Sequence, residues 1–300
     1  MRIFVTGATG FVGSAIVQEL LGAGHHVLGL ARSEAAAQTL TAAGAEVHRG
    51  SLDDLDSLRR GAAASDGVIH CAFIHDFTQY AAAAEADRRA VEAVGAALAG
   101  SDRPFIVTSG FAGLTRQGDF MTEEDTLDPN LPAMRHSEGA ALALVPQGVR
   151  AMVMRLAASV HDKGDHGFVP TLIAIARQKG VAAYIGDGSN RWPAVHRLDA
   201  AHLYRLALEN GTAGARYHGV ADAGIPMRDI AAVIGRHLNV PVASVTQEEA
   251  PAHFGWMAGF AGLDLAASSS LTQQRLSWHP SHPALFPDLE QGHYFTAHTI

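Results

Sequence analysis

The sequence predicts an α/β protein: a doubly wound parallel sheet followed by a smaller C-terminal capping region. Three observations support this. Short runs that are apolar throughout alternate with helical segments over the first 158 residues, a glycine-rich turn joins the first run to the first helix, and polar glycine-rich loops follow. With 300 residues, 48% of them hydrophobic, the chain is long enough to bury such a core.

The elements follow one another in the order that a parallel sheet requires. Residues 2–6 form an apolar strand, residues 14–21 continue at helical spacing, and Gly22 and Gly24 end that helix. The further elements expected are strands over 26–30, 46–49, 68–72, 105–108 and 151–156, and helices over 34–43, from Asp53 as N-cap, over 80–99, and after Pro132.

The second half of the chain changes character after the last of these strands. We expect residues 1–158 to form the sheet domain, completed by 194–220, where residues 216–220 return to the sheet edge. Residues 159–193 and 221–300, which include HDKGDHGFVP and YIGDGSNRWP, are expected to form a substrate-binding region.

Composition argues against several classes of protein. A net charge of −8 and a pI near 6.1 disfavour a nucleic-acid partner. We find neither a transmembrane span nor a signal peptide, and the single cysteine, Cys71, allows no internal disulfide, so we expect a cytoplasmic protein. The seventeen histidines lack metal-ligand spacing, so no metal is predicted.

The turn TGATGFVG carries the first functional signal. Gly7 permits a tight turn, Gly10 allows close approach of a pyrophosphate, and Gly13 lets the helix pack close to the strand. The N-terminus of that helix supplies N–H groups and the positive end of its dipole. The turn therefore predicts a dinucleotide site.

The spacing TGxxGxxG resembles the extended branch of the short-chain dehydrogenase/reductase superfamily, which includes the NAD-dependent epimerases and dehydratases. VIHCA and FIVTSG resemble its fourth and fifth strands. The resemblance implies a Rossmann-type domain and a nicotinamide cofactor. The cofactor-binding positions expected are Gly7, Thr9, Gly10, Phe11, Val12, Gly13, Arg32, Ser33, Ser51, Leu52, Cys71, Ala72, Thr108 and Met134.

The end of the second strand bears on which nicotinamide is bound. An acidic residue there would accept hydrogen bonds from the ribose 2′-OH. The sequence GLARSE instead has Ala31 at that position, followed by Arg32 and Ser33, and Glu34 comes next. A guanidinium and a hydroxyl suit a 2′-phosphate, so NADP(H) is favoured over NAD(H).

The chain lacks the pair of residues that the resemblance leads one to expect. Redox members of the superfamily use Tyr-x-x-x-Lys on the helix before the sixth strand, but the lysines here are Lys163 and Lys179, and neither follows a tyrosine at that spacing. Aligning Glu138 with a family glutamate puts Asn130 and Met134 at the positions of the pair. The chain resembles the atypical members that lack these residues.

Replacement catalytic residues are sought where strands end near the nicotinamide. The candidates are Ser109, His161, which stands at a family tyrosine position, and His136; Phe73, Asn130 and Trp192 are expected to line a substrate pocket. Phe73 to Asp76 and Arg135 are further candidates, and Asp199 is expected to cap a helix.

The predicted function is an NADP(H)-dependent oxidoreductase acting on a small ketone, enone or imine with a non-standard proton donor. The alternatives are a catalytically reduced NADP(H)-sensing protein and an epimerase or dehydratase. The expected partner is a small-molecule substrate, and a homodimer through the helices within 80–99 and 130–145 is the family-level expectation.

Overall fold

A computed structural model describes residues 1–76, 79–128 and 135–296. Its larger part is a seven-stranded sheet in the order β10-β6-β5-β4-β1-β2-β3, with every pairing parallel. The direction of winding reverses between β1 and β4, which is where dinucleotides bind in such sheets. The strands are β1 (Arg2–Thr6), β2 (His26–Ala31), β3 (Glu46–Arg49), β4 (Gly67–His70), β5 (Pro104–Ser109), β6 (Arg150–Leu156) and β10 (Arg216–Gly219).

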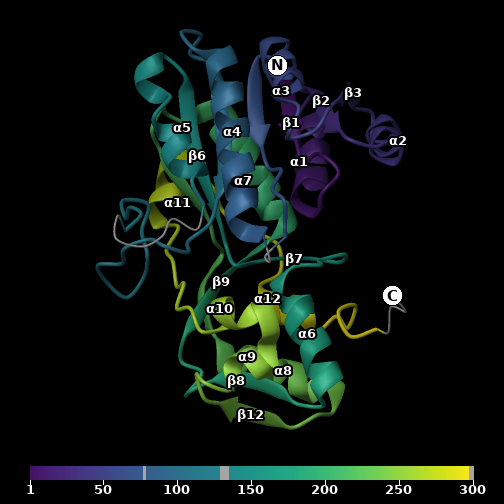
Figure 1. The fold of residues 1–300 in the computed structure, drawn as a ribbon, viewed down its shortest axis with the longest axis vertical. Coiled ribbons are helices and arrows are strands. Elements are labelled where there is room, and N and C mark those ends of the chain that lie inside the picture. The colour runs from purple at the N-terminus through teal and green to yellow at the C-terminus, as the bar shows by residue number, and fades with distance from the viewer. Residues whose placement is uncertain (77–78, 129–134, 297–300) are drawn as a thin grey trace.

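Helices cover both faces of this sheet (Figure 1). Along β1, Ile3 and Val5 belong to one hydrophobic core and Phe4 to another, because successive strand residues point to opposite faces. The first core is covered by α1 (Phe11–Gly22), α2 (Glu34–Ala42) and α7 (Arg197–Asn210). The second is covered by α3 (Leu55–Ala63), α4 (Tyr80–Leu98) and α5 (Ser137–Leu142).

A smaller part of the molecule lies beyond the carboxyl ends of the strands (Figure 1). It contains a three-stranded sheet, β11-β9-β7, and a parallel pair, β12-β8. Its strands are β7 (Ser159–His161), β8 (Ala182–Ile185), β9 (Arg191–His196), β11 (Asp222–Pro226) and β12 (Val242–Val245). The helices here are α6 (Phe168–Lys179), α8 (Met227–Leu238), α9 (Ala250–Phe254), α10 (Ala258–Ala261) and α12 (Leu285–Leu289), with a 3₁₀ turn at Gly255–Met257. Two elements belong to the larger part instead. Helix α11 (Ser270–Leu276) packs on α7 and β10, and a second 3₁₀ turn, Val145–Gln147, precedes β6.

The α/β class and the parallel sheet are confirmed, and residues 216–219 pair with β6 at the sheet edge as expected. The prediction that Asp53 caps the third helix is wrong by one residue. The carboxylate of Asp54 accepts a hydrogen bond from the Ser57 amide at 2.9 Å, so the helix begins at Leu55.

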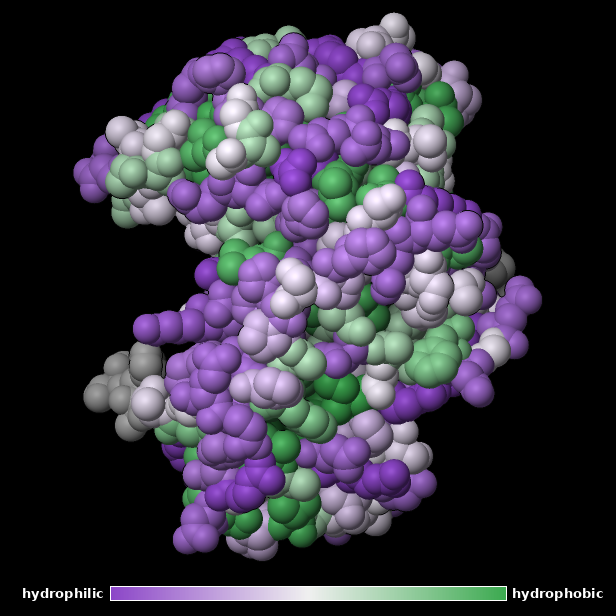
Figure 2. Space-filling model, turned by 180° about the vertical axis from the view of Figure 1, so that it is seen from behind, coloured by the Kyte–Doolittle hydropathy of each residue, from purple (hydrophilic) through white to green (hydrophobic). Residues whose placement is uncertain are grey.

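The carboxyl ends of the parallel strands face the smaller part, and Figure 2 shows the surface hollowed between the two parts. Ligands of open α/β sheets bind outside these strand ends. Within the described ranges, no helix has both the length and the apolar character needed to cross a bilayer.

Candidate active site

The glycine turn has the geometry of a phosphate-binding turn. Gly7 has a φ of 68°, and a Cβ on it would lie 2.8 Å from the Ala72 nitrogen. A Cβ on Gly13 would lie 2.0 Å from the Gly7 carbonyl oxygen, which no real contact allows. Gly10 is the N-cap of α1 without a side-chain cap, and the first turn holds no acid. The first amides of α1 are therefore left for an anion, so the turn fits a diphosphate.

The residues that are predicted to favour NADP(H) over NAD(H) follow the end of β2. Arg32 and Ser33 are exposed, and the Ser33 hydroxyl caps α2 by accepting a hydrogen bond from the Ala36 amide at 3.2 Å. The Glu34 carboxylate pairs with Arg49 at 2.5 Å. The nearest acidic group is therefore neutralised by its own partner.

The other predicted cofactor positions lie at the same edge of the sheet. Ser51 and Leu52 follow β3 and are half-buried. The Ala72 amide donates to the Thr6 hydroxyl at 3.3 Å, and the Thr108 hydroxyl lies 2.7 Å from that of Tyr204 and 3.4 Å from Cys71 Sγ. Thr108 thus anchors the end of β5 to α7. Met134 lies outside the described residues.

A buried polar network runs from β1 to the segment before α5. The Thr6 hydroxyl lies 2.8 Å from His70 Nδ1, and His70 Nε2 lies 3.0 Å from the Asp87 carboxylate. Arg135 donates to Asp87 from Nε at 2.9 Å and from Nη2 at 3.2 Å. Burial alone would raise the pKa of Asp87, but the His70 hydrogen bond and the Arg135 charge outweigh it and lower that pKa.

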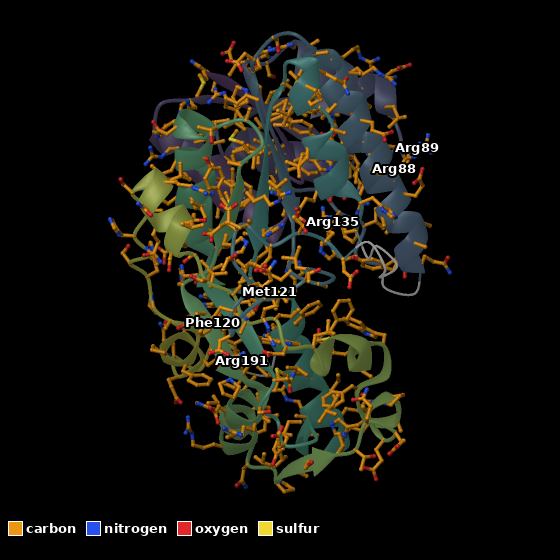
Figure 3. All side chains as sticks on the ribbon, turned by 90° about the vertical axis from the view of Figure 1, so that its left-hand side faces the viewer. Arg88, Arg89, Phe120, Met121, Arg135 and Arg191 are labelled. Atoms are coloured by element: carbon orange, nitrogen blue, oxygen red, sulfur yellow. The ribbon has the colours of Figure 1, made fainter. Side chains whose placement is uncertain are left out.

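Arg135 ends this network at the boundary between the two parts of the molecule. Its guanidinium carbon lies 4.3 Å from the centre of the Phe73 ring, and Figure 3 shows it between the sheet and the smaller part. The expected α5 helix begins later, at Ser137, so Arg135 and His136 precede it. The sequence analysis does not identify Asp87, although its place four residues from both Ala83 and Val91 puts this carboxylate on the apolar face of α4.

The three candidate catalytic residues occupy different environments. Ser109 ends β5 and is 7% exposed, whereas His136 is an exposed N-cap residue of α5. His161, in β7, is fully buried, and its Nδ1 lies 2.8 Å from the Asp288 carboxylate. In the described part of the chain, its buried Nε2 has no hydrogen-bond partner.

The predicted pocket residues also differ in exposure. Phe73 is half-buried beneath Arg135, whereas Trp192 is 1% exposed and packs against Phe168, with ring centres 5.6 Å apart. Asn130 lies outside the described residues. Glu138 is buried and accepts from Arg155 at 2.6 and 2.9 Å and from Arg216 at 2.8 Å.

The prediction that Asp199 caps a helix is wrong. His196 is the N-cap of α7, and its Nδ1 accepts from the Leu198 amide at 3.2 Å. Asp199 is buried and accepts hydrogen bonds from the backbone amides of Ser281 and His282, each at 3.0 Å. It therefore holds the C-terminal segment against α7.

Positive charge outside the sheet is mostly balanced by neighbouring carboxylates. Two arginines, Arg116 and Arg191, share Asp264 at 2.7 and 3.0 Å, and Arg191 is labelled with Phe120 in Figure 3. Among the described residues, no group of histidine, cysteine or acidic side chains is arranged to hold a metal. Within residues 159–296, the other arginines with a carboxylate partner are Arg197, Arg205, Arg216, Arg228, Arg236 and Arg275.

Comparison with known proteins defines the class. Residues 3–220 match the NAD dependent epimerase/dehydratase family, and the chain belongs to it, in agreement with the resemblance to extended short-chain dehydrogenases/reductases. An uncharacterized protein of Schizosaccharomyces pombe is 52% identical over 98% of this chain and 100% of its own length. A 2-alkyl-3-oxoalkanoate reductase of Stenotrophomonas maltophilia is 28% identical over 77% of this chain and 73% of its own.

The fold is shared with solved members of this group. The dTDP-glucose 4,6-dehydratase of Streptomyces venezuelae, crystallised with NAD, superimposes with a TM-score of 0.77 at 21% identity, covering 98% of this chain and 96% of that one. At that identity the likeness shows the Rossmann-type fold.

Proposed function

We propose that the protein is an NADP(H)-dependent oxidoreductase that reduces a small ketone, enone or imine without the Tyr-x-x-x-Lys pair. One observation carries the proposal. Arg135 is a fixed cation, anchored on buried Asp87 and on the Phe73 ring at the carboxyl edge of the sheet, in a chain that has no Tyr-x-x-x-Lys. This cation stands one position after Met134, which aligns with the family lysine.

The chain's own residues account for cofactor binding. The first amides of α1 would bind the diphosphate, and Gly7 and Gly13 let it approach the backbone. Arg32 and Ser33 would contact a 2′-phosphate, and the pairing of Glu34 with Arg49 reduces the repulsion that an acid would exert there. A bound nicotinamide would supply the hydride.

The protein must stabilise the negative charge that develops during the reduction and provide a route for the proton. Negative charge develops on a carbonyl oxygen as it is reduced, and the guanidinium of Arg135 would stabilise it. The hydroxyl of Ser109, at the end of β5, would donate a hydrogen bond to the same oxygen. The proton would come from His136 or water, since His161 Nε2 is buried and must be uncovered before it can act.

Charge pairing disfavours a nucleotide-sugar substrate. A diphosphate needs cations with spare donors, but most arginines of the capping region are matched with carboxylates, as Arg191 and Arg116 are with Asp264. The similarity to a 2-alkyl-3-oxoalkanoate reductase supports a carbonyl compound without phosphate groups. The absence of the tyrosine and lysine favours, as the alternative, a protein that binds NADP(H) and senses it.

Binding and turnover together test the proposal. NADPH and NADH are titrated by fluorescence, and NADPH oxidation is followed with a panel of ketones, enones and imines. We expect NADPH to bind at least roughly tenfold more tightly than NADH, since a charge-assisted contact to the 2′-phosphate is strong. Tight NADPH binding without oxidation by any substrate would favour sensing, and tighter binding of NADH would reverse the cofactor assignment.

Variants at two positions test the roles of the Arg135 cation and the Ser109 hydroxyl. Arg135→Lys keeps a cation for Asp87, whereas Arg135→Met removes it, and we expect only the latter to lower kcat/KM by roughly 100-fold. Ser109→Ala is expected to lower kcat with NADPH affinity unchanged. Arg228→Met, a change on the exposed surface of α8, serves as the control. Full activity of a folded Arg135→Met protein would contradict the role of the cation.

A further inference from the structure

Two basic side chains from outside the glycine turn contact Phe11, the first residue of α1. The guanidinium carbon of Arg197 lies 4.8 Å from the centre of the Phe11 ring. The ring of His166 meets the same ring edge-on, with centres 5.9 Å apart and planes at 78°. Arg197 begins α7, and His166 belongs to the loop between β7 and α6. The phosphate-binding turn is therefore contacted from the capping side as well as from the sheet.

Arg197 has more hydrogen-bond donors than partners. Its Nη2 lies 3.0 Å from the Asp162 carboxylate, and its side chain is 25% exposed. Its Nε is buried and, within residues 1–76, 79–128 and 135–296, has no hydrogen-bond partner. A guanidinium carries five N–H donors, and a buried donor without an acceptor is costly. A guanidinium with an unpaired buried donor is expected where a bound ligand, and not the protein, supplies the acceptor.

The position of Arg197 fits the diphosphate of a dinucleotide. Phe11 is the first residue of α1 and supplies one of the amides that an anion would contact, so the guanidinium over its ring lies beside the residue that begins the anion site. No acidic residue stands in the first turn of α1 to compete for it.

We propose that Arg197 binds the cofactor diphosphate, exchanging its contact with Asp162 for the phosphate oxygens. Asp162 then acts as a competitor that holds Arg197 in the empty protein. Since Arg197 and Asp162 belong to α7 and to the loop after β7, cofactor binding draws on groups outside the glycine turn. The inference rests on the cofactor site of the proposed function and not on the proposed reaction.

The competitor role gives opposite predictions for the two partners of one ion pair. Arg197→Gln removes the cation and should raise the dissociation constants of NADPH and of ADP-ribose by the same factor, roughly tenfold, since both carry the diphosphate. Asp162→Asn releases Arg197 and removes a nearby negative charge, so it should lower both constants severalfold. Arg197→Lys keeps the charge without the fork of donors and should fall between wild type and Arg197→Gln.

The measurements are fluorescence titration with NADPH and calorimetric titration with ADP-ribose, at two salt concentrations. Arg205→Gln is the matched control, because Arg205 also lies on α7 and pairs with Glu19 of α1 at 2.7 Å, farther along both helices. It should leave both constants within twofold. The affinity lost by Arg197→Gln should shrink at high salt.

Two results would overturn the inference. Equal weakening by Arg197→Gln and Asp162→Asn would mean that the ion pair only supports the structure, and unchanged affinity in Arg197→Gln would mean that the guanidinium does not reach the diphosphate. A wild-type protein that binds NADPH but reduces nothing refutes the proposed reaction and leaves this binding test intact.

Discussion

Replacing Gly13 by alanine is the sharpest perturbation that the fold offers. The added Cβ would stand 2.0 Å from the Gly7 carbonyl oxygen and 2.8 Å from its carbonyl carbon, where contacts below 3.0 Å are not found. Both neighbours are backbone atoms, so α1 or the turn must shift by about 1 Å, at a cost of about 1–3 kcal/mol. The shift moves the amides that hold the diphosphate, and losing one charge-assisted hydrogen bond of about 1.5–3 kcal/mol weakens binding roughly 10- to 100-fold.

Gly22→Ala is the control within the same helix. Gly22 ends α1, and a Cβ there meets nothing within 4 Å. Alanine should therefore leave stability unchanged or raise it by about 0.5 kcal/mol, with unchanged affinity. Thermal unfolding and NADPH titration measure both quantities. If Gly13→Ala matched Gly22→Ala in both, the close packing of the turn would not be what positions the cofactor.

Two further predictions concern stability. Glu138→Ala leaves buried Arg155 without its carboxylate and should cost about 3–5 kcal/mol in chemical denaturation, whereas Glu124→Ala, which removes the exposed partner of Arg275, should cost less than about 1 kcal/mol. Burial raises the pKa of Asp165 to about 6, so its ionisation destabilises the fold as pH rises from about 4 through 6. Asp165→Asn should therefore stabilise the protein by about 1 kcal/mol above pH 6, after allowance for partial exposure, and the gain should vanish below pH 4. A gain independent of pH would contradict the raised pKa.

Local sequence signals predicted the elements that depend on them. Apolar runs such as residues 2–6 and 105–108 match β1 and lie within β5, since each carries its own strand signal, and the glycine spacing identified the turn. The cap at Asp54 was misplaced because Asp53 and Asp54 have the same chemistry. Residue type alone could not choose between them.

The partners of the site residues could not be predicted, because they are distant in sequence. Asp87 and Arg135 are 48 residues apart, and His161 and Asp288 are 127 apart. Such pairs exist only once the sheet and the capping part are folded. For the same reason Asp199 looked like a helix cap, while its carboxylate binds residues 281–282.

Hydride transfer itself is the most direct test of the proposed function. The protein is incubated with NADPH deuterated on one face of nicotinamide C4 and with the best substrate of the carbonyl panel, and the product is analysed by mass spectrometry. We predict that one of the two deuterated cofactors places a single deuterium on the reduced carbon, with one equivalent of NADPH consumed. No deuterium in the product and no NADPH consumed, despite tight binding, would contradict the assignment as an oxidoreductase.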